Sequence, residues 1–128
     1  MNYYFHKTVE GDFDTILEKV TKELENEGFG VLTEINVNET FKKKLDLDFH
    51  RYHILGACNA PYAYKALAAE DKIGAMLPCN VILQQLDDGM VEIAAVNPVA
   101  LMQAVENDEL GEISKEIAKK LFKVVEKV

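Results

Sequence analysis

The sequence predicts a two-layer α+β fold, in which helices pack on one face of a largely antiparallel sheet of about five strands. Three observations lead to this fold class. Short segments rich in β-branched and aromatic residues recur along the chain, and segments with apolar residues at helical spacing separate them. The two kinds of segment do not alternate strictly, as they would in a fold built around a parallel sheet.

The first two elements are a strand and an amphipathic helix. Residues 2–9, "NYYFHKTV", have the aromatic and β-branched composition of a strand. The helix that follows places five apolar residues on one face: Phe13, Ile16, Leu17, Val20 and Leu24. Asp12 is suited to cap its start, and Gly28 is suited to end it.

Two further strands are predicted in the first half, over residues 29–37 and 49–57. Between them, "NETFKKKLDLD" predicts a short helix, with Asn38 as its cap and with Phe41 and Leu45 turned inward. The third strand leads directly into the first cysteine.

The second half predicts a helix, a β-hairpin and two more helices. The helix covers residues 60–70, with Asn59 as its cap, and the hairpin strands cover 79–86 and 90–96 around the turn "DDG". Asn97 and Pro98 are typical of a helix start, and a short helix follows them. The final helix carries one apolar stripe: Leu110, Ile113, Ile117, Leu121 and Val124.

Composition and charge limit the classes of function. The 128 residues suffice for a single domain spanning 1–128, and they carry 22 acidic against 14 basic side chains, a net charge of −8. This sign of charge disfavours nucleic acids and anionic membranes as partners. The N-terminus lacks the features of a signal peptide, and no segment reaches the ~20 apolar residues that span a bilayer. We therefore expect a cytoplasmic protein with reduced thiols.

The two cysteines of the chain each precede an asparagine. Cys58 ends a predicted strand just before a helix, where backbone N–H groups bind anions or lower the pKa of a thiol. Gly56 would let a ligand or a neighbouring chain approach the backbone. The alternative is purely structural: Asn59 caps the helix, and Cys58 is a small buried apolar residue.

The second Cys-Asn pair opens a strand after Pro78. Cys79 shares its face with Val81 and Leu83, which predicts a position in the core. Asn80 points the opposite way, and its amide would hold the Pro78 turn in shape if it were buried.

Metal binding and thiol catalysis have weaker support in the sequence. The cysteines lie 21 positions apart and form no C-x-x-C pair, so no metal site is predicted. A site formed by both cysteines and one of the three histidines, or by the cysteines of two subunits, stays open. A thiol-dependent redox protein or enzyme using Cys58 is a further alternative, although no base is visible beside either cysteine.

The stretch "GACNAPYAYKALAAEDKIGAMLPCNVIL" resembles the prokaryotic family catalogued as domain of unknown function 302. A later Asn97-Pro98 also matches, and the resemblance extends over nearly the whole chain. In two respects the chain departs from the family pattern: Ala60 precedes Pro61, and Met76 replaces a leucine. The resemblance implies a compact α+β fold assembled as a homodimer, and it implies no reaction.

These observations favour a homo-oligomeric binding module without an established function. Its pocket, for a small molecule, a sulfur species or a soft metal, would be formed by residues of the two motifs: Gly56, Cys58, Asn59, Pro78, Cys79 and Asn80. The alternative is a dimerisation domain without chemistry. The cofactor is unknown.

Overall fold

The computed structural model describes residues 2–128. The elements in chain order are β1 (Tyr4–Glu10), α1 (Phe13–Asn26), β2 (Gly30–Asn36), α2 (Val37–Leu45), β3 (Tyr52–Cys58), α3 (Ala60–Ala69), the 3₁₀ helix η1 (Asp71–Met76), β4 (Cys79–Gln85), the short turn η2 (Asp87–Gly89), β5 (Met90–Val96), α4 (Pro98–Met102) and α5 (Asp108–Lys127). The predicted order of strands and helices is confirmed. None of the helices in residues 2–128 combines the length and the apolar character needed to cross a membrane.

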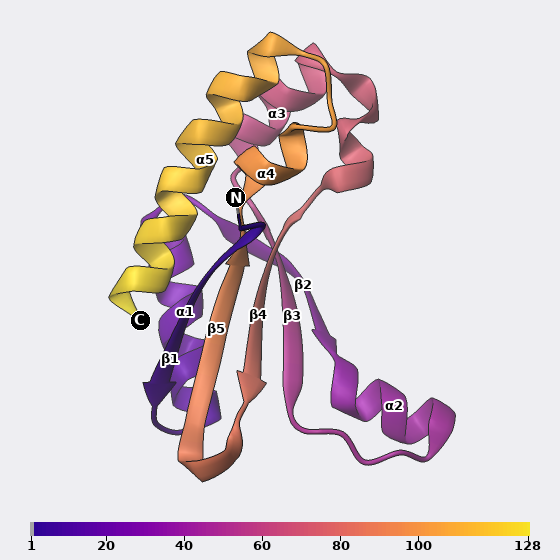
Figure 1. Cartoon of the computed structure of the whole chain (residues 1–128), viewed down its shortest axis with the longest axis vertical. Coiled ribbons are helices and arrows are strands. Elements are labelled where there is room, and N and C mark those ends of the chain that lie inside the picture. The colour runs from indigo at the N-terminus through magenta and orange to yellow at the C-terminus, as the bar shows by residue number, and fades with distance from the viewer. Residues whose placement is uncertain (1) are drawn as a thin grey trace.

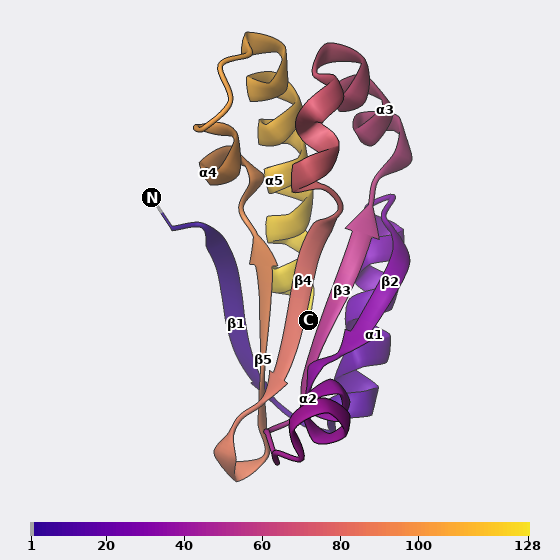
Figure 2. The same ribbon diagram turned by 90° about the vertical axis from the view of Figure 1, so that its right-hand side faces the viewer.

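The five strands form one sheet in the order β1-β5-β4-β3-β2, and every neighbouring pair is antiparallel. Figure 1 shows α1 and α5 covering one face of this sheet, and Figure 2 looks onto the other face, most of which is open. This arrangement confirms the predicted two-layer α+β fold.

The main core lies between the sheet and the two helices that cover it. Alternate residues of β3, β4 and β5 point toward the helices and are almost completely buried: Leu55, Ala57, Val81, Leu83, Val91, Ile93 and Ala95. The predicted stripes of α1 and α5 pack against them. Removing such a buried side chain leaves a cavity, which costs about 2–5 kcal/mol for Leu→Ala.

A smaller cluster lies beyond the upper ends of the strands. It contains Ala66 of α3, Ile73 of η1 and Leu110 of α5. Figure 1 shows α5 running past the end of the sheet to lie beside α3 and α4. The single helix α5 therefore joins two hydrophobic clusters, since Ile117 and Leu121 belong to the main core.

Helix α1 has the predicted termini. The carboxylate of Asp12 accepts a hydrogen bond from the backbone N–H of Thr15 (3.1 Å). Gly28 follows the helix with a φ of +87°, the left-handed region in which glycine is favoured. The Phe29 N–H donates to the Leu24 carbonyl (2.9 Å), which completes the C-terminal motif typical of such a glycine.

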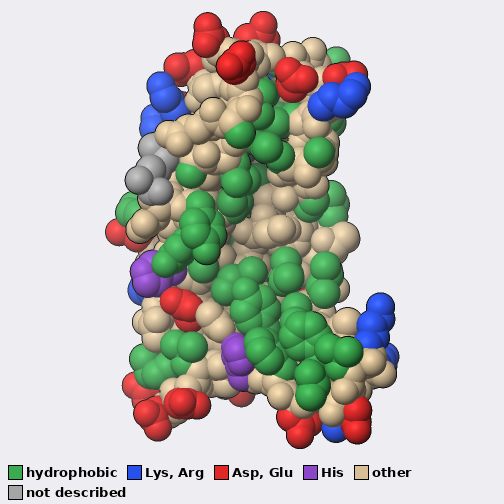
Figure 3. Space-filling model, turned by 45° about the vertical axis from the view of Figure 1, so that its right-hand side comes forward, with side chains coloured by type: hydrophobic (Ala, Val, Ile, Leu, Met, Phe, Trp, Pro, Cys, Tyr) green, Lys and Arg blue, Asp and Glu red, His purple; other side chains and the backbone are tan. Residues whose placement is uncertain are grey.

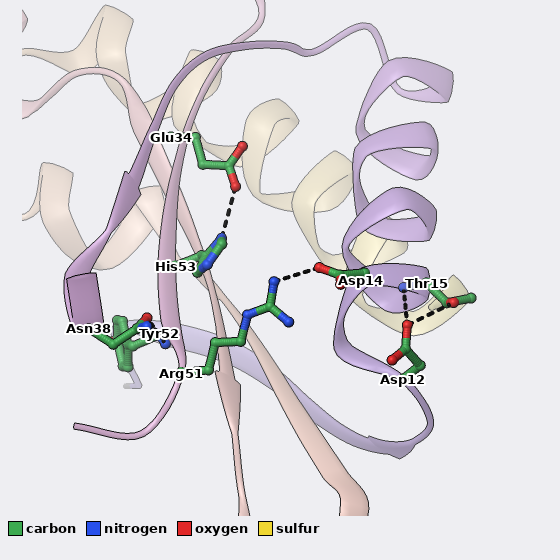
Figure 4. Close-up of polar contacts among 8 residues, drawn as sticks. All are labelled: Asp12, Asp14, Thr15, Glu34, Asn38, Arg51, Tyr52 and His53. Atoms are coloured by element: carbon green, nitrogen blue, oxygen red, sulfur yellow. Dashed lines mark hydrogen bonds and ion pairs between the residues drawn. The ribbon is translucent and has the colours of Figure 1, made fainter. Parts of the chain in front are cut away.

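Polar contacts join the start of α1 to the segment before β3, and join β3 to β2 (Figure 4). Arg51 Nη2 lies 2.5 Å from Asp14 Oδ1, and its guanidinium carbon lies 4.2 Å from the ring centroid of Phe13. The buried His53 places Nδ1 2.8 Å from Glu34 Oε1. A partly exposed ion pair such as Arg51–Asp14 adds at most about 1 kcal/mol to stability.

Two expectations for α2 are wrong. The side chain of Asn36, not Asn38, caps the helix by accepting from the Glu39 N–H (3.1 Å). Asn38 instead accepts from the Tyr52 N–H of β3 (3.1 Å). Leu45 is 59% exposed rather than turned inward, because α2 lies at the end of the sheet, where no second layer covers it.

Candidate functional site

A cavity of about 320 Å³ lies where the two hydrophobic clusters meet. Phe29, Ala57 and Ile117 of the main core form one part of its wall. Ala66, Ile73 and Leu110 of the smaller cluster form another part. The wall is almost entirely apolar, and no charged side chain of residues 2–128 contributes to it. Ligand pockets in proteins have this concave, largely apolar form.

Cys58, at the end of β3, and Asn59, at the start of α3, both line the cavity. Cys58 is the last residue of β3 and lies opposite Gly30 of β2. Asn59 is 7% exposed and occupies the N-cap position of α3, but its side chain makes no capping hydrogen bond. Its Nδ2 donates to the Glu27 carbonyl at the end of α1 (3.1 Å). The expected capping role is thus wrong, because the terminal carbonyls of α1 also need donors.

Cys79 begins β4 and lies opposite Ala57. It packs against the main core and lines the cavity. Burial raises the pKa of the Cys79 thiol to about 11, and the nearby Cys58 adds to this shift. The thiol therefore stays protonated near neutral pH. Pro78 precedes it and also contributes to the wall.

Gly56 has a close-packed environment. A Cβ at this position would collide with Thr33 Oγ1 and would lie 2.8 Å from Pro78 Cγ. Glycine is therefore required for these two residues to approach β3. From the sequence, we expected a ligand or a neighbouring chain to approach Gly56. The side chains of Thr33 and Pro78 occupy that space instead, so Gly56 has a role in packing.

Asn80 does not join the other motif residues. It is exposed on the open face of the sheet, where it lines a separate depression with Tyr52, Ile82 and Gln84. Cys79 and Asn80 are successive residues of β4 and point to opposite faces of the sheet, and Asn80 is not part of the cavity wall. The structure brings Cys58, Asn59, Pro78 and Cys79 together and leaves Asn80 apart.

The histidines lie away from the cavity wall. His6 contacts Glu92 (3.0 Å), His50 contacts Gln84 (2.8 Å), and His53 contacts Glu34 (2.8 Å). Among residues 2–128, no group of three or more His, Cys, Asp or Glu side chains is arranged to hold a metal ion. Neither cysteine therefore has an imidazole or carboxylate beside it in the wall to act as a base.

Several wall residues were not predicted from the motifs. Met102, Ile113 and Ser114 come from α4 and α5, far from both cysteines in the sequence. One signal was available: Ser114 lies at helical spacing between Leu110 and Ile117, a polar residue within the apolar stripe of α5. The alanines of α3 were a second signal, because small side chains leave space beside a helix.

Gly56→Ala should destabilise the fold by about 1–3 kcal/mol, because the added methyl overpacks the space beside Thr33 and Pro78. Urea denaturation measures the change. Gly30→Ala is the matched control, since a Cβ there meets no atom within 4 Å and should shift stability by less than about 0.5 kcal/mol. Equal effects at the two glycines would contradict this packing role.

Cys79 should react slowly with iodoacetamide, because only the thiolate is nucleophilic. In Cys58→Ser, which leaves one thiol, the alkylation rate should rise with pH toward a midpoint near the pKa of about 11. The unfolded chain ionises first, at the ordinary value of 9.0, so this thiol's contribution to stability should be lost between these two values as pH rises. A midpoint at or below 9.0 in the folded protein would contradict its burial.

The comparisons with known proteins agree with the resemblance seen in the sequence. A solved structure described as "Crystal structure of uncharacterized conserved protein DUF302 from Bacillus stearothermophilus" has 29% sequence identity to this chain and a TM-score of 0.89, and the match covers 97% of this chain and 96% of that one. A comparison with curated proteins finds no match. The family described as "Domain of unknown function DUF302" matches residues 5–128, and the chain therefore belongs to this family.

Proposed function

We propose that this protein is a binding module that holds a small apolar molecule in the cavity between its two hydrophobic clusters. The observation that carries the proposal is the cavity wall, which lines a volume of about 320 Å³, partly open to solvent, with almost no polar surface. Protein interiors are normally close-packed, with few voids larger than a water molecule. An apolar cavity of roughly 150 Å³ already binds benzene, so this one has room for a larger compound.

The few polar groups of the wall limit the charge and the hydrogen-bonding groups that a ligand can carry. Ser114 Oγ donates to the Gly111 carbonyl (2.9 Å), and Asn59 Nδ2 donates to the Glu27 carbonyl. Within residues 2–128, Asn59 Oδ1 accepts no hydrogen bond. A neutral ligand with one hydroxyl or N–H group matches this acceptor. A charged ligand would lose its hydration without gaining a charged partner.

The composition of the same wall makes a thiol-dependent enzyme the weaker of the proposed functions. Nucleophilic catalysis by a cysteine needs a base within hydrogen-bond reach and a group that orients the base. The cavity supplies neither, since its wall contains no histidine and no carboxylate from the described part of the chain. The geometry favours retention of a ligand over its conversion.

A filled cavity should no longer bind its ligand. Ala63 lines the cavity, so Ala63→Leu should weaken binding of the neutral fluorescent probe N-phenyl-1-naphthylamine by about tenfold or more, a loss of about 1.4 kcal/mol. Ala68→Leu, on the exposed side of the same helix, is the matched control and should leave affinity unchanged. Fluorescence titration measures both, and thermal unfolding verifies that the variants fold. The proposal fails if the wild type does not bind the probe or if the two variants behave alike.

A second candidate function, homodimerisation, is favoured by the open face of the sheet. Ile35 and Phe49 are 49% and 43% exposed, and Ile35 lies opposite Ile54 on the uncovered side. Phe49 lies 6.4 Å from Tyr52, centroid to centroid. We call Ile35, Phe49, Tyr52 and Ile54 the open-face patch, and Figure 3 shows hydrophobic side chains gathered over this part of the molecule.

The proposed occupant of the open-face patch is a second copy of the chain. In a two-fold dimer the same patch meets itself, so an uncharged apolar patch is self-complementary. Two chains with a net charge of −8 each repel one another, and the repulsion is least where their contact carries no charge.

Phe49→Asp should dissociate this dimer, because it places two carboxylates in a contact that must exclude water. Native mass spectrometry over a protein dilution series measures the change. Tyr64→Asp, at an exposed position of α3 that is 75% accessible, is the control and should leave the dimer intact. A wild-type monomer, or a dimer that survives Phe49→Asp, would contradict this interface.

A further inference from the structure

Three sulfur-containing residues line the cavity, and each comes from a different element. Cys58 ends β3, Cys79 begins β4, and Met102 ends α4, and all three residues line the wall. The register places the two backbones side by side: Cys79 lies opposite Ala57, and Cys58 is the next residue along β3. The two thiols are close enough that Cys58 contributes to the raised pKa of Cys79. Both cysteines of the chain and one of its four methionines therefore lie at a single site.

The electrostatic surroundings of Cys58 favour a negative group. Helix α3 begins two residues after Cys58 and runs for ten residues, so its positive N-terminal end lies next to this residue in the chain. The side chain that normally neutralises such an end is engaged elsewhere, because Asn59 donates to the Glu27 carbonyl and does not cap α3. No carboxylate of residues 2–128 lines the wall, so nothing there opposes an anionic metal–thiolate group.

We propose that Cys58 and Cys79 together bind one Cu(I) ion at the cavity wall. On binding, the ion replaces the two thiol protons, two Cu–S bonds form, and the bound unit carries one negative charge. Thiolate and thioether sulfur are soft ligands, which select Cu(I) over harder cations. The apolar wall excludes water, and the thioether of Met102 adds a further soft atom to the same surface.

The number of donors favours Cu(I) over zinc. A structural zinc site takes four ligands in a tetrahedron, commonly Cys and His. Here the wall supplies two thiols and no histidine, and no group of three or more such ligands exists within residues 2–128. Cu(I) accepts two sulfur ligands in a linear arrangement, so the two thiols complete the donor set for this ion, whereas zinc would lack two ligands. The inference goes beyond the proposed function, because it uses the same cavity without requiring an apolar occupant.

Anaerobic titration of the reduced protein with Cu(I), in competition with the chelator bicinchoninate, tests the inference. We expect one Cu(I) per chain, with two sulfur neighbours by X-ray absorption. Cys58→Ser and Cys79→Ser should each lower the affinity by roughly 100-fold or more, since even changes outside the ligand set cost about 10–100-fold. Met90→Leu is the control: Met90 begins β5 and does not line the cavity, so removing its sulfur should keep the one-to-one complex.

The outcomes separate this site from the cavity proposal. Copper binding that survives both serine variants would place the ion elsewhere and overturn the inference. A chain that binds N-phenyl-1-naphthylamine but takes up no Cu(I) would overturn the copper site and leave the apolar function standing. Uptake of Cu(I) without probe binding would overturn the apolar function and leave the copper site standing. If Cys79→Ser fails to fold, Cys58→Ser and the count of sulfur neighbours in the wild type still decide.

Discussion

The length of helix α5 relative to the strands determines the plan of the whole molecule. Its 20 residues span about 30 Å, whereas each seven-residue strand spans about 23 Å. The lower end of α5 is fixed to the sheet, where Lys7 Nζ of β1 donates to the Glu126 carbonyl (2.8 Å). The apolar stripe at the upper end therefore extends beyond the sheet and needs another cover. Helices α3, α4 and η1 supply that cover, and the cavity lies where their cluster meets the main core.

The position of the cysteines follows from this plan. Strand β3 ends and β4 begins at the upper edge of the sheet, where the two clusters meet, so both thiols lie at the boundary rather than inside either core. The surroundings keep the pKa of the Cys79 thiol high, while the uncapped start of α3 provides a local positive potential beside Cys58. One small region therefore combines an apolar volume with two soft ligands. This combination explains how a single cavity could serve both the apolar ligand and the metal ion that we propose.

The two faces of the sheet have different roles. Helices α1 and α5 cover the inner face, and its side chains are almost fully buried. The outer face has no such cover over most of its area, and it leaves the open-face patch in contact with solvent (Figure 2). The cavity lies at the ends of β3 and β4, and none of the open-face patch residues contributes to its wall.

Local sequence determined most of the elements and the burial pattern. Apolar spacing predicted α1 and α5, alternation predicted the faces of β4, and Gly28 and Asp12 predicted the termini of α1. Each of these signals depends on residues within about one helical turn or one strand. The motifs also drew attention to Cys58 and Cys79. Only the tertiary structure decided that Asn59 holds α1 rather than capping α3, that Gly56 accommodates Thr33 and Pro78, and that Met102 and Ser114 complete the cavity. These contacts join residues far apart in the chain, and they form only when two clusters of different elements meet along α5.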